Sequence, residues 1–329
     1  MYSVIIPVYG NAEFVPSMIA EFASINEIVQ RRFGIPVEFV FVVDKSPDAS
    51  YTLLEEALPG AAFCSQLILH ARNFGSFAAI RTGLHAAKGD YFGIIAADLQ
   101  EPPEILVSFL KALIGNTHDI AVGVREGRDD PVSSRFSANL FWSFYRRFVM
   151  KEIPPGGVDV FGCNRKVRDE LLKLDEANSS LLGQVFWLGF RRIEVGYVRR
   201  ARAHGKSAWT LRKKIAYLLD SVFAFTALPI HILTVIGALG TSIAMLFGIV
   251  IIILRLSNQF EVPGYAATMV AIMFFGALNT LGLGIVGAYT WRAYENTKHR
   301  PLAVVQSAKA FEGTTSKPVP NPLTVGNPS

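Results

Sequence analysis

Two long runs without charged side chains constrain this chain of 329 residues more than any other feature. No Lys, Arg, Asp or Glu occurs between Pro229 and Arg255, or from Gly264 through Trp291. Each run exceeds the roughly 20 residues that cross a bilayer as a helix. Buried core helices are the alternative, but two such runs in succession argue against it. The short connector RLSNQFEVP then predicts a transmembrane hairpin with spans at about 230–254 and 265–291.

Basic residues flank this hairpin and predict its orientation. They are Arg199, Arg200, Arg202, Lys206, Arg212, Lys213 and Lys214 before the first span, and Arg292, Lys298 and Arg300 after the second. The positive-inside rule predicts a multi-pass protein of the cytoplasmic (inner) membrane with both termini in the cytoplasm. A basic cluster beside a span meets anionic lipid more readily than nucleic acid, so no nucleic-acid partner is expected. Two isolated cysteines, Cys64 and Cys163, fit a reducing compartment.

Strands and helices alternate over residues 1–198, which we expect to form one α/β domain. Short apolar runs predict strands at 2–8, 37–43, 66–70 and 91–97, and helical periodicity predicts helices at 13–32, 48–58 and 76–87. This spacing is typical of a mainly parallel sheet covered by helices on both faces.

Polar side chains follow three of these strands: Tyr9, Asp44 and Asp98. In a parallel sheet such positions meet at one edge, where ligands bind. If the chain stays extended after Asp98, Gln100 points to the same side. A carboxylate and an amide oxygen there would suit a hard cation that carries phosphate oxygens. A second interpretation stays open, in which Asp98 caps the helix that follows Pro102 and Pro103.

The remaining segments complete the predicted organisation. Apolar residues at helical spacing in 207–228, after a basic lead-in, predict a helix lying in the membrane interface. Packing of this helix on the soluble domain is the alternative. The composition beyond Pro301 predicts a disordered tail. The expected domains are 1–198, a basic loop and interfacial helix at 199–228, the hairpin at 229–291, and a largely disordered cytoplasmic tail at 292–329.

Eight sequence motifs occur in an order that is typical of one family. They are VIIPVYG at 4–10, VVDKSPDAS at 42–50, RNFG at 72–75, ADLQEPPE at 97–104, VGVREGRDDPVSSR at 122–135, GGVDVFG at 156–162, WLGF at 187–190 and RRARAHGKSAWTLRKK at 199–214. Together with the two spans, they make residues 1–300 resemble the polyisoprenyl-phosphate glycosyltransferases of glycosyltransferase family 2. The resemblance implies a GT-A (Rossmann-like) nucleotide-sugar domain. It also implies inverting transfer from a nucleotide sugar, UDP-linked, to a polyisoprenyl phosphate such as undecaprenyl phosphate, for cell-envelope glycans such as lipopolysaccharide.

The resemblance also implies roles for individual residues. Donor-binding roles fall on Pro7, Tyr9, Asp44 and Gln100, and a metal role, for Mg²⁺ or Mn²⁺, falls on Asp98 and Gln100. Acceptor-phosphate binding falls on Arg125, Arg135, Asn139, Arg202, Lys206 and Ser207. Asp98 and Asp159 would be catalytic, and Asp159 would orient the acceptor or act as a base. An alternative for Arg125 and Arg135 is a surface ion pair with Asp129 or Asp130.

Two departures from the family pattern leave other functions open. Many members have Asp-Ala-Asp where this chain has Ala96-Ala97-Asp98, which predicts weaker metal binding. The acidic motif after the second strand is reduced to Asp44-Lys45-Ser46. Loss of the first carboxylate leaves open a non-catalytic, membrane-bound nucleotide-sugar-binding scaffold. A processive polysaccharide synthase is the other alternative, since that class is similar up to Asp98, although this chain lacks its Gln-x-x-Arg-Trp motif. Small residues in the second span also permit a homo-oligomer (Gly276, Gly282, Gly284 and Gly287).

Overall fold

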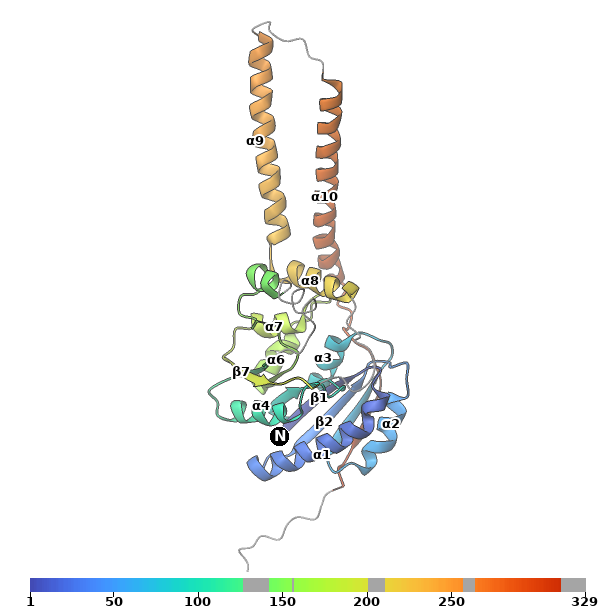
Figure 1. The fold of residues 1–329 in the computed structure, drawn as a ribbon. Coiled ribbons are helices and arrows are strands. Elements are labelled where there is room, and N and C mark those ends of the chain that lie inside the picture. Colours follow the sequence, from blue (N-terminus) through green and yellow to red (C-terminus); the bar gives the residue numbers. More distant parts are fainter. Residues whose placement is uncertain (127–141, 156, 201–210, 257–263, 315–329) are drawn as a thin grey trace, which may run out of the picture.

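The computed structural model describes residues 1–126, 142–155, 157–200, 211–256 and 264–314. An α/β domain carries two long helices that extend away from it side by side (Figure 1). The strands are β1 Tyr2–Val8, β2 Val37–Val43, β3 Cys64–His70, β4 Tyr91–Ile94, β5 Ile120–Arg125, β6 Phe161–Asn164, β7 Arg192–Tyr197 and β8 Val305–Phe311. The helices are α1 Val15–Phe33, α2 Ser50–Ala57, α3 Ser76–Ala86, α4 Glu104–Ile114, α6 Arg165–Lys173, α7 Leu181–Trp187, α8 Leu211–Phe225, α9 Leu228–Leu256 and α10 Tyr265–Thr297, with short 3-10 turns at Ala12–Phe14 and Leu58–Gly60.

The eight strands form one mixed, mainly parallel sheet in the order β7-β5-β6-β4-β1-β2-β3-β8. The expected strands and helices of the first hundred residues are confirmed, although the fourth strand ends at Ile94 rather than Ala97. β2 and β4 flank β1 on opposite sides, and both pair with it in parallel. The chain therefore changes direction across the sheet between β1 and β4. Such a switch point opens a crevice at the carboxyl ends of the strands.

Helices cover both faces of the sheet, as the apolar strands predict. One core cluster joins alternate residues of β1, such as Val4 and Ile6, to α1, α2 and α4. The other joins Ile5 of the same strand to α3, α6 and α7. Because side chains alternate along a strand, a strand buried on both faces has to be apolar throughout. This arrangement is the GT-A-like α/β fold that was expected.

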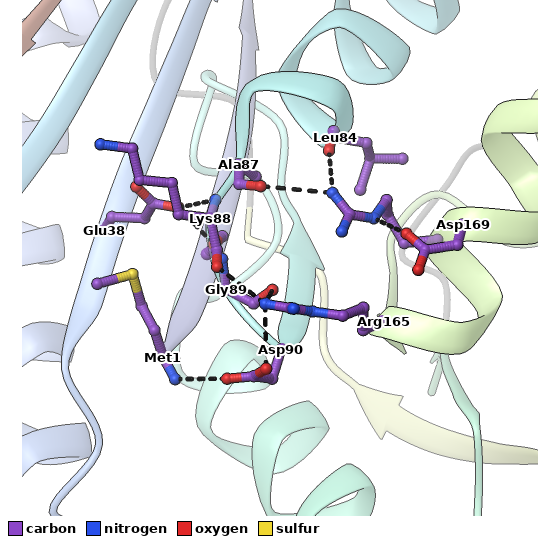
Figure 2. A network of polar contacts seen from close by, with 11 residues as sticks. Met1, Glu38, Leu84, Ala87, Lys88, Gly89, Asp90, Arg165 and Asp169 are labelled. Atoms are coloured by element: carbon purple, nitrogen blue, oxygen red, sulfur yellow. Dashed lines mark hydrogen bonds and ion pairs between the residues drawn. The ribbon is translucent and has the colours of Figure 1, made fainter.

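A polar network closes the opposite, amino-terminal edge of the strands (Figure 2). The Met1 ammonium binds Asp90 Oδ2 at 3.0 Å, and Arg165 Nη2 binds Asp90 Oδ1 at 3.1 Å. Arg168 Nη1 donates to the Leu84 carbonyl at 3.1 Å, at the end of α3. These contacts tie α6 to the strands from the side away from the crevice, so we assign them to stability.

The helices α9 and α10 are long and apolar enough to cross a membrane, with apolar stretches at Leu228–Val250 and Thr268–Thr297. Helices are found at the positions of both predicted spans, and α10 continues beyond the expected end at 291. That these helices cross a membrane stays a prediction. Large apolar side chains on both helices are exposed, among them Leu239 and Phe274 at 59% and 61%. Exposed apolar surface of this extent indicates contact with lipid or another apolar partner.

Helix α8 lies across the base of this hairpin (Figure 1). Its inner face packs on the domain, where Tyr217 stacks on Tyr145 and accepts a hydrogen bond from Ser180 Oγ at 3.0 Å. Its outer face leaves Ile215 and Leu219 about half exposed, at 50% and 47%. Packing on the soluble domain is therefore confirmed for one face. Contact of the other face with the membrane interface stays a prediction.

The expectation of a largely disordered tail after residue 292 is wrong for 305–311. Strand β8 pairs antiparallel with β3 at the edge of the sheet. Most of its residues are exposed, Gln306 and Lys309 among them, so it lacks the continuous buried apolar run of a central strand, and tail composition alone does not reveal it. Residues 315–329 lie outside the described part of the chain.

Candidate active site

A cleft of about 870 Å³ opens at the carboxyl ends of β1, β2 and β4. Four residues singled out by the sequence line it: Pro7, Tyr9, Asp44 and Asp98. Tyr9 follows β1 and Asp98 follows β4, the two strands at the switch point. The expected meeting of the three polar strand ends is therefore found.

Asp44 is buried, and its carboxylate holds the turn before α3. Oδ1 accepts from the Phe74 N–H at 2.9 Å and Oδ2 from the Gly75 N–H at 2.7 Å. His70 Nδ1 lies 2.8 Å from Oδ1, and its Nε2 lies 2.9 Å from Thr82 Oγ1. The turn needs glycine because Gly75 has φ +95°. Asp44 thus shapes the cleft wall through the RNFG segment, and Asn73 does not cap α3, whose N-cap is Gly75.

The segment after β4 forms a turn instead of continuing as a strand. Leu99 has φ +52°, a left-handed conformation that costs an L-residue about 1–2 kcal/mol. This turn breaks the extended geometry on which the pairing of Asp98 with Gln100 was predicted. Asp98 faces the cleft, whereas Gln100 Oε1 accepts from Arg199 Nη2 at 2.8 Å. The helix-cap interpretation of Asp98 is also wrong, because the N-cap of α4 is Pro103.

Next to this turn, buried Glu101 pairs with Arg199, whose side chain is partly exposed. Arg199 Nε lies 3.4 Å from Glu101 Oε1, and Glu101 is 1% exposed. Its other oxygen, Oε2, has no hydrogen-bond partner among the residues that the structure describes. Burial, followed by the charge of Asp159, raises the pKa of Glu101 to about 7, while Arg199 opposes this shift and Asp98 adds to it.

The raised pKa of Glu101 predicts a pH-dependent stability. The folded protein keeps a proton on Glu101 up to about pH 7, whereas an ordinary glutamate loses it near 4.5. Between these values the folded state binds more protons, so the free energy of unfolding falls as the pH rises, by ~3 kcal/mol in total. In Glu101→Gln we expect this decline to disappear when apparent melting temperatures of the detergent-solubilised protein are measured from pH 4.5 to 8.

Glu104→Gln is the matched control, since Glu104 lies at the exposed start of α4. It should keep the decline seen in the wild type. An equal decline in the wild type and in Glu101→Gln would contradict the assignment to Glu101.

A second cluster of polar side chains lies at the ends of β5 and β7 and consists of Arg125, Asp159 and Tyr197. Arg125 Nε donates to Asp159 Oδ2 at 2.6 Å, and the Tyr197 hydroxyl donates to the same oxygen at 3.0 Å. Burial opposes the charge of Arg125, but Asp159 and Tyr197 together outweigh it and hold the pKa of the guanidinium above its usual range. The charges of Asp159 and Asp98 both act on Glu101. Asp98 and Asp159, the two residues predicted to be catalytic, therefore both lie close enough to Glu101 to raise its pKa.

Several predicted site residues lie outside the described part of the chain: Arg135, Asn139, Arg202, Lys206 and Ser207. Asp129 and Asp130, the proposed ion-pair partners of Arg125, lie there too. Of the predicted acceptor-binding residues, the described structure therefore contains Arg125 alone, and its partner is Asp159.

Sequence reasoning missed three residues of this site: Glu101, Tyr197 and His70. Glu101 is part of the ADLQEPPE motif, but neither its residue type nor its position in the motif predicts that it is buried. Tyr197 and His70 are the last residues of β7 and β3, so the same strand-end rule that selected Asp44 applies to them.

A mainly parallel sheet with a cleft at its switch point defines an α/β protein that binds its ligand at the carboxyl edge of the strands. The profile of the family described as "Glycosyl transferase family 2" matches residues 3–174. The chain belongs to this family and is a glycosyltransferase.

Relatives match over nearly the whole chain. An uncharacterized glycosyltransferase of Synechocystis is 29% identical and covers 94% of this chain and 96% of its own. A protein of Shigella phage SfV named bactoprenol glucosyl transferase is also 29% identical, over 93% of this chain and 98% of its own. Among solved structures, a mannosyltransferase from Pyrobaculum calidifontis in complex with GDP-Man and Mn²⁺ is 18% identical, covers 89% of this chain and 84% of its own, and has a TM-score of 0.42.

Proposed function

We propose that this glycosyltransferase moves a sugar from a nucleotide sugar, UDP-linked, to a polyisoprenyl phosphate such as undecaprenyl phosphate, with inversion at the anomeric carbon. The product would serve cell-envelope glycan modification. The main support is the meeting of Tyr9, Asp44 and Asp98 in one cleft at the switch point. Relatives named bactoprenol glucosyl transferase support the lipid acceptor, and the two apolar helices support a site held at a membrane.

A divalent ion, Mg²⁺ or Mn²⁺, fits the donor set around Asp98. In the described residues no three His, Cys, Asp or Glu side chains are grouped to form a complete metal cage. Mg²⁺ is commonly bound through one or two carboxylates, with the rest of its shell from water and substrate phosphates. Asp98 would hold the ion, and Gln100 would join it only after its contact with Arg199 opens. The ion would supply positive charge for the leaving diphosphate.

The residues near Asp159 would position the acceptor. A phosphate monoester has its second pKa near ~6, so its oxygen needs no strong base at neutral pH. The lipid phosphate and the donor diphosphate are both anions and repel each other, so a cation has to hold the lipid phosphate in a fixed geometry. The Arg125 guanidinium would bind the lipid phosphate, with Asp159 orienting it, and Arg135, Asn139, Arg202, Lys206 and Ser207 would complete this site.

The membrane segments would hold the site at the height of the lipid phosphate. Residues 1–198 would form the cytoplasmic catalytic domain, 199–228 the interfacial segment and 229–291 the hairpin, with both termini cytoplasmic. Labelling single cysteines in 257–263 with a membrane-impermeant reagent on intact cells tests this topology. Protection of this connector together with labelling of the tail would refute it.

The experiment that tests the function is a donor panel. Membranes containing the protein are incubated with undecaprenyl phosphate and with labelled UDP-glucose, other UDP sugars and GDP-mannose. We expect labelled sugar in a lipid fraction that releases it on mild acid hydrolysis. Labelled polymer would indicate a processive polysaccharide synthase instead, and binding without transfer for every donor would indicate a scaffold.

A further inference from the structure

The chain returns to the α/β domain after α10 (Figure 1). The returning segment contributes Leu302 to the lining of the cleft. We call residues 298–311 the C-terminal strap. Its strand β8 extends the sheet beyond β3, from Ser65 opposite Phe311 to His70 opposite Val305. A segment that follows the second apolar helix is thus built into the same sheet as the amino-terminal strands.

The strap binds the two loops that form one end of the cleft. The Ala71 N–H donates to the Val304 carbonyl at 2.9 Å, directly before the RNFG segment. Lys45 Nζ donates to Gln306 Oε1 at 3.1 Å, in the loop after β2. Leu302, which precedes both contacts, lines the cleft itself.

The end of α10 is fixed to the other side of the same cleft. Arg292 Nη2 donates to Asp220 Oδ1 at 2.7 Å, and the Ala177 N–H donates to Asn296 Oδ1 at 3.1 Å. Asp220 and Ala177 both line the cleft. Leu302 therefore lies between two fixed points, the end of α10 at Asn296 and the Val304 carbonyl that binds Ala71.

The place of Leu302 indicates which part of a ligand it meets. Asp98 follows β4, and the strap runs beside the loop after β3, three strand spacings away or about 14 Å. A nucleotide sugar with its diphosphate at Asp98 would direct its uncharged nucleoside toward the other end of the cleft. At that end the lining includes Phe74 and Leu302, whose apolar side chains are suited to a planar base.

We propose that Leu302 contacts the nucleoside of the donor, so that the C-terminal strap completes the donor site. The donor site then depends on the end of α10, the helix from which the strap continues. This inference rests on the proposed function, because it takes the ligand of the cleft to be a nucleotide sugar. It assigns a specificity-determining residue to a segment that lies beyond the family match at 3–174.

The test compares full-length variants in nanodiscs. Leu302→Ala should weaken UDP binding about 5- to 10-fold, measured by calorimetry, because about half of a buried leucine's contact is lost. Leu302→Met should restore most of the affinity. In transfer assays the KM for the donor should rise in Leu302→Ala while the KM for the acceptor stays constant.

Val305→Ala is the matched control, since Val305 lies on the same strap, is 46% exposed and is not part of the cleft lining. It should bind UDP like the wild type. Equal weakening in Val305→Ala and Leu302→Ala, or no weakening in either, would overturn the inference while leaving the function intact. A wild type that binds no nucleoside diphosphate would instead overturn the proposed function, and the inference with it.

Discussion

Asp98→Asn should lose sugar transfer almost completely. The substitution keeps the size of the side chain and removes the one charged carboxylate that we place beside the donor diphosphate. Loss of one group that stabilises charge in a transition state lowers kcat on the order of 10²- to 10³-fold. This chain has Ala96 and Ala97 directly before Asp98, so no neighbouring carboxylate compensates, and we expect the upper part of that range.

The measurement is the rate of labelled lipid formation at saturating donor and acceptor, over a range of Mg²⁺ and Mn²⁺ concentrations. Asp90→Asn is the matched control, because Asp90 precedes β4 and Asp98 follows it. Asp90 binds the Met1 ammonium and Arg165, so its loss should lower stability and leave the transfer rate near that of the wild type. Transfer by Asp98→Asn within about tenfold of the wild type would remove Asp98 from the chemistry.

The cleft could be predicted from the sequence because it depends on regular structure. Buried parallel strands have continuous apolar runs, and the residue after each run lies at one edge of the sheet. Tyr9, Asp44 and Asp98 were found by this rule alone. The two long apolar helices could be predicted equally well, because uncharged runs of this length are typical of helices.

The details of the site could not be predicted, because they depend on contacts between distant segments. The left-handed conformation of Leu99 breaks the extended geometry predicted for Asp98 and Gln100. Arg199, almost a hundred residues later, binds the Gln100 side chain. Asp44 looked like a ligand-binding residue, yet His70 and the turn before α3 occupy its oxygens. Strand β8 was missed because an edge strand does not need the continuous apolar run of a strand buried on both faces, and VQSAKAF has none.

Arg125→Lys should impair acceptor use while sparing donor binding. Lysine keeps the charge but replaces a planar fork of donors by a single ammonium, which cannot hold Asp159 and a phosphate in fixed directions. A lost hydrogen bond between charged groups corresponds to a ~10- to 100-fold change. We expect kcat/KM for undecaprenyl phosphate to fall by about this factor, with the UDP dissociation constant unchanged.

Arg191→Lys provides the matched control for a pair that is merely structural. Arg191 Nε binds Asp119 Oδ2 at 2.9 Å, next to the start of β7. Tyr197, which shares Asp159 with Arg125, is the last residue of the same strand. If Arg125 only joined β5 to Asp159, both lysine variants would lose stability to a similar degree and neither would change the KM for the acceptor. A selective effect on the acceptor requires instead that Arg125 reaches the lipid phosphate. In the double variant Arg125→Lys/Asp159→Asn, the loss of kcat/KM for the acceptor should then be smaller than the two single losses combined. Residues that bind one ligand together do not act independently.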